Sequence, residues 1–321
     1  MQICIDDGST SIKLAWNDAG KMNTFISENA FARGDAILSG DRPALTYVVG
    51  NDRYHYNPGM NAETTTNVQY QYSAVNAVAV QHALQESGLK PQEVDIIATL
   101  PLAEFYTRAG LRNEANVERK ISNLCQPMKV IGGEAFTIRS VKVVPESIPA
   151  GIDIINGLEE DQSLLIIDIG GTTLDLSLVG AGGRVLDIRG HEGIGVSTIT
   201  ERVQDALQGA HLRASAKVVN TLIAHYDDPA FIDARTNTPA QVGAFKSAFS
   251  AARDELCAAV LAEVNKVQGF THCVVVGGGA RLIADSVRAL PQCPVNRFTV
   301  PADAQLALVT GIYSMFGGRS E

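Results

Sequence analysis

Short apolar runs alternate along the chain with longer segments whose apolar residues recur at helical spacing, and this alternation predicts an α/β fold. Strands are predicted at residues 1–6, 11–16, 45–49, 53–56, 94–100, 136–144, 164–168, 174–179 and 273–276. Helices are predicted at residues 75–86, 194–208, 240–267, 280–290 and 304–315. Ser73 and Asp303 are the expected N-caps of the first and last of these helices. Tight turns are expected to join the first two strands, and the next two, into hairpins.

The chain contains an internal repeat. Residues 5–14 (IDDGSTSIKL) align without gaps on residues 167–176 (IDIGGTTLDL). Each copy has an apolar strand, an aspartate, a turn of small polar residues and a second strand. The acidic stretch Glu159-Glu160-Asp161 lies between the copies and is the expected domain boundary. We therefore expect two related domains that face each other, each directing one hairpin at a shared cleft.

The turns of the repeat have the composition of a phosphate-binding site. Glycine lets the backbone approach an anion closely, successive N–H groups form an anion nest, and hydroxyl groups add donors. The candidate nucleotide-binding residues are Gly8, Ser9, Thr10, Gly170, Gly171, Thr172 and Thr173. Asp6 and Asp168, at the strand ends, would repel phosphate and are expected to hold a hydrated Mg²⁺. One copy alone would indicate a plain tight hairpin, whereas two matched copies beside a boundary favour a nucleotide site.

Two further segments carry candidate chemistry. Gly277-Gly278-Gly279 follows an apolar strand and opens a helix, where backbone can press against a nucleotide, but it lacks the spacing of a dinucleotide-binding loop. Glu146 lies in PESIPAG at 145–151, just after another apolar strand. It could orient the water that attacks a phosphoryl group, or it could be a first-turn acid that favours a helix dipole. The local sequence does not separate these two interpretations.

Composition and charge narrow the classes of function. The 321 residues are 45% hydrophobic and carry a net charge of −9, which argues against a broad nucleic-acid-binding face. The 5 cysteines are odd in number and include no C-x-x-C pair, which disfavours a disulfide framework and fits a reducing compartment. The N-terminus lacks a signal-peptide pattern, and no apolar run approaches the ~20 residues of a membrane span. We expect a cytoplasmic protein that binds neither nucleic acid nor membrane directly.

The paired hairpins, the Glu146 segment and the late glycine turn resemble those of the actin, sugar-kinase and heat-shock-chaperone ATPase superfamily. Within it, the sequence resembles most the ParM/StbA family of actin-like ATPases, which segregate bacterial plasmids. The segments that carry the resemblance are IDDGSTSIKLAW at 5–16, ETTTNVQYQYSAVNAVAVQHAL at 63–84, VDIIATLPLAEFY at 94–106, FTIRSVKVVPESIPAG at 136–151, SLLIIDIGGTTLDLS at 163–177 and VVVGGGA at 274–280.

The resemblance implies an actin-like ATPase fold, in which two related RNase H-like lobes enclose a nucleotide. Lobe I would span 1–158, with an outer subdomain at roughly 18–66. Lobe II would span 159–302, with an outer subdomain at roughly 196–268. Residues 303–321 would form a C-terminal helix that returns to lobe I.

The resemblance also implies a chemistry and partners. Glu146 would position the hydrolytic water, with Asp6 and Asp168 as further catalytic residues. Asp7 would belong to the first phosphate loop, and Gly277, Gly278 and Gly279 would lie on the adenosine side. The cofactors would be ATP or GTP with Mg²⁺. The protein would assemble with itself into dynamic filaments that hydrolysis destabilises, and a ParR-like DNA-binding adaptor would bind the filament end.

Two alternatives come from the same superfamily. A sugar-kinase- or phosphatase-type enzyme would couple nucleotide turnover to a small substrate and would show no threshold concentration for assembly. A chaperone ATPase is expected less, because few residues follow the last predicted helix to form a peptide-binding domain. The residues in 193–239 that would contact base and ribose are not predicted.

Overall fold

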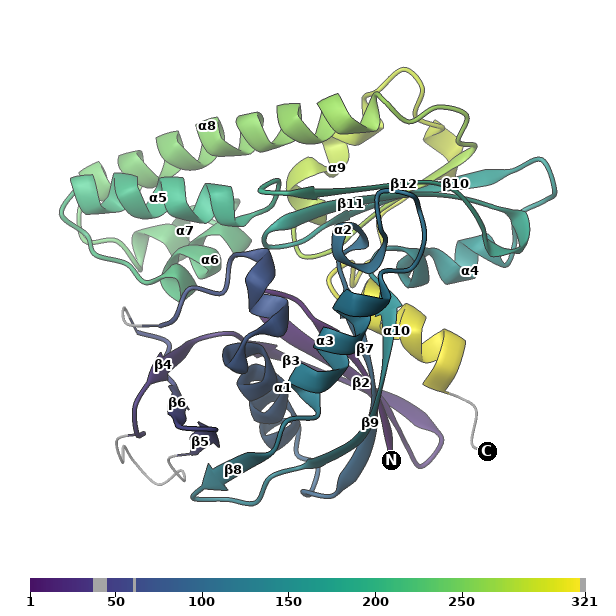
Figure 1. Ribbon diagram of the computed structural model, residues 1–321. Coiled ribbons are helices and arrows are strands. Elements are labelled where there is room, and N and C mark those ends of the chain that lie inside the picture. The colour runs from purple at the N-terminus through teal and green to yellow at the C-terminus, as the bar shows by residue number, and fades with distance from the viewer. Residues whose placement is uncertain (37–44, 60–61, 318–321) are drawn as a thin grey trace.

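Two five-stranded sheets, one in each half of the chain, organise the fold (Figure 1). The computed structural model describes residues 1–36, 45–59 and 62–317. The outer subdomain predicted at 18–66 and the stretch predicted at 303–321 lie in part outside the described residues. No helix within the described ranges is long and apolar enough to cross a membrane.

The elements of the first half supply one of these sheets and a smaller one. Its strands are β1 (Gln2–Asp7), β2 (Ser11–Asp18), β3 (Lys21–Glu28), β4 (Phe31–Arg33), β5 (Thr46–Val49), β6 (Asp52–Tyr56), β7 (Glu93–Leu100), β8 (Met128–Ile131) and β9 (Thr137–Pro145). Its helices are the 3-10 helix η1 (Val68–Tyr72), α1 (Ala74–Glu86), α2 (Leu102–Phe105) and α3 (Glu114–Leu124). The larger sheet has the order β3-β2-β1-β7-β9, and the smaller one has the order β4-β6-β5-β8.

The elements of the second half supply the other five-stranded sheet. Its strands are β10 (Ser163–Ile169), β11 (Thr173–Gly180), β12 (Arg184–Glu192), β13 (His272–Val276) and β14 (Phe298–Thr299). Its helices are α5 (Ser197–Gly209), α6 (Ala216–Ala224), α7 (Pro229–Asp233), α8 (Pro239–Val264) and α9 (Ala280–Arg288). The segments η2 (Ile148–Gly151) and α4 (Ile152–Ile155) precede this sheet, and α10 (Ala307–Ile312) follows it. The order β12-β11-β10-β13-β14 repeats that of the first sheet.

The repeat seen in the sequence extends to strand direction. In each large sheet, the strand that ends in the repeated aspartate pairs antiparallel with the next strand of its hairpin and parallel with a later strand. At the edge of each sheet, a third strand (β3 or β12) pairs antiparallel with the second strand of the hairpin (β2 or β11). Two copies of one topology therefore present the same ends of their central strands, β1 and β10, to each other.

Alternation along the central strand buries both faces of each sheet. Ile3 and Ile5 of β1 pack in the same core cluster as α1, whereas Cys4 packs with Val309 and its neighbours in α10. Successive strand residues point to opposite faces, so α1 and α10 cover opposite sides of the first sheet. In the second sheet, the face that carries Ile167 packs against apolar residues of α5 and α8. A strand buried on both faces reads as a continuous apolar run, which is why β1 and β10 were found from the sequence.

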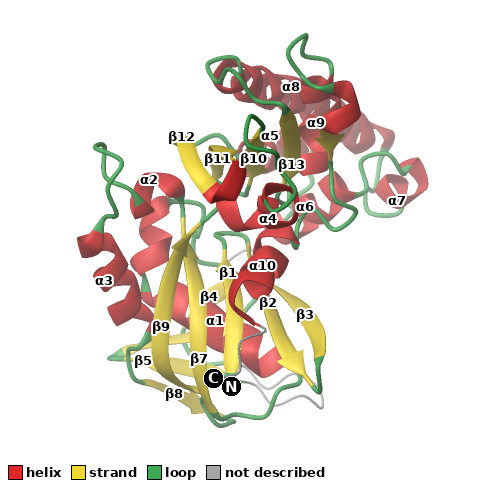
Figure 2. Cartoon of the chain, turned by 90° about the vertical axis from the view of Figure 1, so that its right-hand side faces the viewer, coloured by secondary structure: helices red, strands yellow, loops and turns green. Residues whose placement is uncertain are grey.

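Two connections cross between the sheets. The chain leaves β9 through η2 and α4 to reach β10, and it returns from β14 through α10 (Figure 2). These crossings are in direct contact, because a Cβ added at Gly311 of α10 would lie 1.9 Å from the carbonyl oxygen of Pro149 in η2. Glycine at 311 is therefore required for the close approach of the two crossings.

The structure confirms the predicted strands and the five predicted helices, and it corrects some of their bounds and caps. Ser73 caps α1 through its side chain, as expected. The last helix begins at Ala307 rather than at 304, and its N-cap is Leu306, so the prediction of Asp303 as its cap was wrong. Residues 303–306 form a hydrogen-bonded turn from the carbonyl of Asp303 to the amide of Leu306 before the helix starts. The elements that were not predicted are strands β3, β4, β8, β12 and β14 and helices α2, α3, α4, α6 and α7.

Candidate functional site

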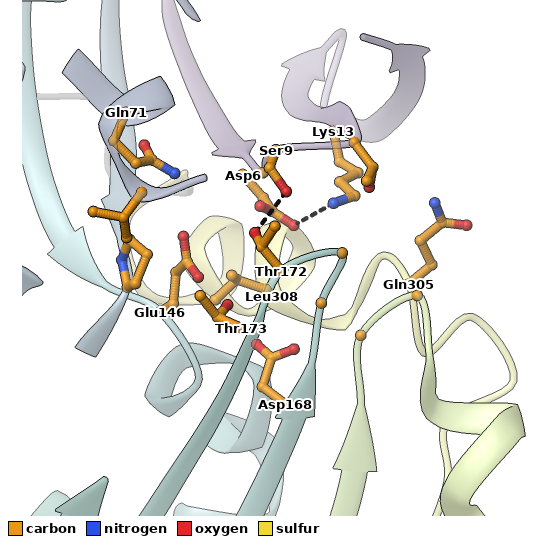
Figure 3. Close-up of a pocket in the computed structure, with 18 of the residues that line it drawn as sticks. Asp6, Ser9, Lys13, Gln71, Glu146, Asp168, Thr172, Thr173, Gln305 and Leu308 are labelled. Atoms are coloured by element: carbon orange, nitrogen blue, oxygen red, sulfur yellow. Dashed lines mark hydrogen bonds and ion pairs between the residues drawn. The ribbon is translucent and has the colours of Figure 1, made fainter. Parts of the chain in front are cut away.

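The two repeated turns meet between the sheets. The hydroxyl oxygens of Ser9 and Thr172 are 2.8 Å apart and share a hydrogen bond (Figure 3). A Cβ added at Gly171 would lie 2.4 Å from Cγ2 of Thr10, so no larger residue fits where the turns touch. The hairpins at 7–9 and 170–172, which are more than 160 residues apart in the chain, therefore form two sides of one cleft.

Most of the residues singled out in the sequence line this cleft. They are Asp6, Gly8, Ser9, Thr10, Glu146, Asp168, Gly170, Gly171, Thr172, Thr173, Gly277 and Gly278. The structure does not bring Asp7 or Gly279 to the lining. Lining residues that the sequence analysis missed include Lys13, Asn67, Gln71 and Gln305.

Lys13 is the main cleft residue that was not identified from the sequence. Its Nζ lies 3.1 Å from Oδ2 of Asp6, and both side chains are nearly buried at the cleft (Figure 3). The two residues are opposite each other in the β1–β2 register. The repeat held a signal for it, because Lys13 aligns with Asp175, the one position where a cation in the first copy is replaced by an acid in the second.

Buried acids gather at the cleft: Asp6 and Asp168 line it, and Asp175 lies opposite Asp168 in the β10–β11 register. Burial raises the pKa of Asp168 to about 7, and the charges of Asp175 and Asp6 add to the effect. Burial likewise raises the pKa of Asp175 to about 7. The pKa of Asp6 is also raised by burial, although Lys13 opposes the shift. Several buried carboxyl groups that disfavour one another's charge make a site suited to a cation.

The acid cluster fits a hydrated cation better than a bare one. Within the described residues, no group of three or more His, Cys, Asp or Glu side chains is arranged to ligate a metal ion directly. Mg²⁺ keeps several of its waters and takes few protein carboxylates, its remaining ligands commonly being substrate phosphates. Asp6 and Asp168, on opposite sides of the cleft, match this mode of binding.

Glu146 enters the cleft from the end of β9, on a strained turn. Ser147 has φ 71° and ψ −65°, and the amide of Ile148 donates to the carbonyl of Glu146 at 2.9 Å. This is the rare γ-turn, a strained conformation of the kind that clusters at functional sites. The backbone of Ser147 favours the charged form of the Asp168 carboxyl group and opposes the rise of its pKa, so the turn lies beside the strand end of the second hairpin.

The surroundings of Glu146 decide between the two interpretations of its sequence. Glu146 precedes Ser147, the N-cap of η2, and the first turn of η2 contains no acidic residue. It therefore does not serve as a first-turn helix acid. Burial raises the pKa of Glu146 well above its ordinary value, with further contributions from Asp175, Asp6 and other acids. A buried carboxyl group directed into a cleft is a candidate for handling a proton or a water.

Asp7 lies beneath the first turn, pointing away from the cleft. Its side chain is 0% exposed and pairs with the ammonium group of Lys120, which is also 0% exposed. Nδ2 of Asn76 donates to it at 2.8 Å. Adjacent residues of a strand point to opposite faces, so Asp6 and Asp7 cannot both face the cleft. The prediction that Asp7 contacts nucleotide is therefore not supported by its placement.

The late glycine turn is divided between cleft and core. Gly277 has φ +89°, and a Cβ there would lie 2.5 Å from Oδ1 of Asp168. Gly278 meets nothing within 4 Å and is open to a ligand. A Cβ at Gly279 would lie 2.7 Å from Cγ2 of Val196, so this glycine is required for packing. Only the first two glycines of the turn are placed to face a nucleotide.

Comparison with known proteins adds a family and a fold. The family model described as "Plasmid segregation protein ParM, N-terminal" matches residues 1–157, and the one described as "Plasmid segregation protein ParM, C-terminal" matches residues 158–315. No curated protein sequence matches the chain significantly.

Solved structures share the fold at low sequence identity. A non-polymerisable quadruple mutant of pCBH ParM has a TM-score of 0.74 at 15% identity, over 98% of each chain. A 15-stranded ParM filament from Clostridium botulinum has a TM-score of 0.72 at 16% identity, over 98% of each chain. Ta0583, an archaeal actin homologue in complex with ADP, has a TM-score of 0.68 at 16% identity, over 97% of each chain.

Proposed function

The chain belongs to the plasmid segregation protein ParM family and has the actin-like ATPase fold, and from this premise we propose that it is an ATPase that polymerises to segregate plasmid DNA. The observation that supports this most is the contact between the two repeated turns across one cleft. A triphosphate in that cleft would touch both halves of the molecule at once. Nucleotide state would then control how the halves sit together, which is the requirement for a nucleotide-gated filament.

The chain's own groups suit the binding of ATP or GTP in this cleft. The turns at 8–10 and 170–173 offer backbone amides and hydroxyl groups to the phosphates, each hydrogen bond to a charged group being worth about 1.5–3 kcal/mol. Lys13 is the cationic side chain among the described residues of the lining, and its ammonium group can exchange Asp6 for phosphate oxygens. Gly277 and Gly278 line the cleft, and at Gly278 no atom lies within 4 Å of where a Cβ would stand, which leaves room for the nucleoside. Asp6 and Asp168 would hold Mg²⁺ through water, and the ion would screen charge on the phosphates.

Glu146 is proposed to act on the attacking water. Phosphoryl transfer to water needs a residue that orients the nucleophile. The γ-turn fixes the backbone of Glu146, and its buried carboxyl group lines the cleft between the two hairpins. There it can accept a hydrogen bond from a water and hold the oxygen towards the terminal phosphate.

Self-assembly and the DNA adaptor complete the proposal. ATP would favour the closed form of the two halves, and this form would match the surface of the next subunit. Loss of the terminal phosphate would remove contacts to one hairpin, and a ligand shifts such an equilibrium only through its differential affinity for the two forms. A ParR-like adaptor at the filament end would account for an acidic protein, of net charge −9, that moves DNA without binding it.

Sedimentation at high speed tests this function. With ATP or its non-hydrolysed analogue AMPPNP we expect the protein to pellet above a threshold concentration, and with ADP to remain in the supernatant. Glu146→Gln is expected to bind nucleotide, to release phosphate slowly and to form longer-lived filaments. A protein that stays monomeric with ATP at tens of micromolar, where even weak self-association is visible, would contradict the proposal.

A further inference from the structure

Beneath the first hairpin lies a buried polar chain. It runs from Lys120 of α3 to Asp7 of β1, which accepts a hydrogen bond from the amide of Thr99 in β7, and then from the Thr99 hydroxyl to Glu146. We propose that Thr99 is a positioning residue for hydrolysis, which holds the Glu146 carboxyl group ready for the attacking water because the Lys120–Asp7 pair fixes Thr99 through its amide. This inference rests on the proposed ATPase function.

The first step is that Thr99 can give its only hydroxyl proton to Glu146. Thr99 is 0% exposed, and its Oγ1 lies 3.3 Å from Oε1 of Glu146 and 3.4 Å from Oδ1 of Asp7. A threonine hydroxyl has one proton to donate. The backbone amide of Thr99 already donates to Oδ1 of Asp7, at 3.3 Å. Of the two acceptors near the hydroxyl, Oε1 of Glu146 is the closer, and donation to it leaves Thr99 tied to Asp7 through the amide.

The second step is that Asp7 cannot move away. Its Oδ2 is held by Lys120 and by Nδ2 of Asn76, at 2.8 Å from the latter. Lys120 is itself fixed by Oδ1 of Asn76 at 3.0 Å and by the carbonyl of Gln71 at 3.1 Å. A β-branched side chain has few rotamers, so this anchored neighbour leaves Thr99 with one orientation.

The third step is that Glu146 needs such a restraint. Burial acts most against its ionised form, and the charges of Asp175, Asp6, Asp168 and Asp7 add to the effect. These acids repel an ionised Glu146 carboxylate, so a hydrogen bond that fixes its orientation is of use. Thr99 supplies the one side-chain hydrogen bond of Glu146 found among the described residues, and it engages one oxygen. The other carboxyl oxygen remains to accept a proton from water.

Thr99→Val tests the proposal because it removes the hydroxyl and keeps the shape. Phosphate release at saturating ATP measures turnover, and calorimetric titration with ADP or AMPPNP measures binding. We expect Thr99→Val to lower kcat about tenfold or more, the loss expected for a hydrogen bond to a charged group, with nucleotide Kd within about threefold of wild type. Thr99→Ser, which keeps the hydroxyl, is expected to retain most of the rate.

A second pair of variants guards against a folding defect. Thr99→Ser and Thr99→Ala both lack the methyl group and differ only in the hydroxyl, so their ratio of kcat isolates the hydrogen bond. Thr99→Val is also made in a Glu146→Gln background, where we expect no further loss of rate. A structural role for Thr99 would instead lower the rate by the same factor in both backgrounds.

The outcomes separate this inference from the proposed function. Three results would overturn the role of Thr99 and leave the proposed ATPase function intact. Thr99→Val could turn over ATP at the wild-type rate, or Thr99→Ser and Thr99→Ala could have the same kcat. The third is that Thr99→Val lowers kcat by the same factor in the Glu146→Gln background as in wild type. Normal phosphate release by Glu146→Gln would instead remove Glu146 from hydrolysis, and the positioning role would fall with it. Absence of nucleotide binding by the wild-type protein would contradict the proposed function itself.

Discussion

Replacing Lys120 by methionine removes the cation beneath the first hairpin while keeping most of the side-chain volume. Lys120 and Asp7 are both 0% exposed. In the variant, the Asp7 carboxylate keeps its bonds from Asn76 Nδ2 and from the amide of Thr99. It nevertheless becomes a buried charge with no opposite charge beside it, and such a charge is costly in a site that water does not reach.

The magnitude follows from this burial. Breaking a fully buried ion pair by removing one partner costs about 3–5 kcal/mol, because the other charge stays uncompensated. The unfolding entropy is about 2.1 cal/mol/K per residue, so in a chain of 321 residues each kcal/mol lowers Tm by about 1.5 °C. We therefore expect Lys120→Met to lower the free energy of unfolding by about 3–5 kcal/mol and Tm by roughly 4–8 °C. Adding Asp7→Asn to Lys120→Met should recover part of the lost free energy of unfolding, because residue 7 then carries no charge.

Thermal and urea denaturation followed by circular dichroism measure the change. Lys266→Met is the matched control, because Lys266 is half exposed and its pairing with Glu263 is a surface contact. Such a pair is worth about 0–1 kcal/mol. A Lys120→Met protein as stable as this control would refute the reasoning. So would a double variant with Asp7→Asn that is no more stable than Lys120→Met alone.

Three further predictions concern charge and close packing. The pKa of Asp175 in the folded protein is raised to about 7, so ionisation of this carboxyl group lowers stability as pH rises from about 4 to 7. Asp175→Asn should therefore raise Tm of the nucleotide-free protein at pH 8 and leave it unchanged at pH 4. Burial lowers the pKa of His82 to about 4, so the protein loses stability as pH falls from about 6.5 to 4. In urea titrations at these two pH values, the free energy of unfolding of His82→Gln should fall by about 3 kcal/mol less than that of wild type. Gly171→Ala would place a Cβ 2.4 Å from Thr10, so calorimetry should show ADP affinity reduced at least about tenfold, whereas Gly209→Ala, where nothing lies within 4 Å, should bind normally.

Much of the fold could be predicted from the sequence because the signals are local. The buried central strands are continuous apolar runs, and Ser73 stands where the first helix needs a cap. The repeat at 5–14 and 167–176 also predicted that two hairpins belong together, and the contact of Ser9 with Thr172 agrees with it. Strand β12 was not predicted because its residues are either exposed or only partly buried, which leaves no alternating pattern.

The candidate site shows the same limit at the level of single residues. The acids and glycines of the two turns are a property of the sequence, and they indicate phosphate chemistry without any coordinates. The local sequence does not show which of the two adjacent aspartates faces the cleft. That depends on Lys120, 113 positions away in the chain, which pairs with Asp7. The γ-turn at Ser147 is likewise imposed from outside, since a serine has no local preference for φ 71°.

Short-range patterning determined the strands, the helices and the chemical character of the turns, because these depend on neighbours a few residues apart. Tertiary packing decided which polar group meets which, because buried charges must find partners wherever the chain brings them, and a strained turn persists only where its surroundings hold it. The link from Lys120 through Asp7 and Thr99 to Glu146 joins α3, β1, β7 and the turn after β9, so no stretch of sequence contains it.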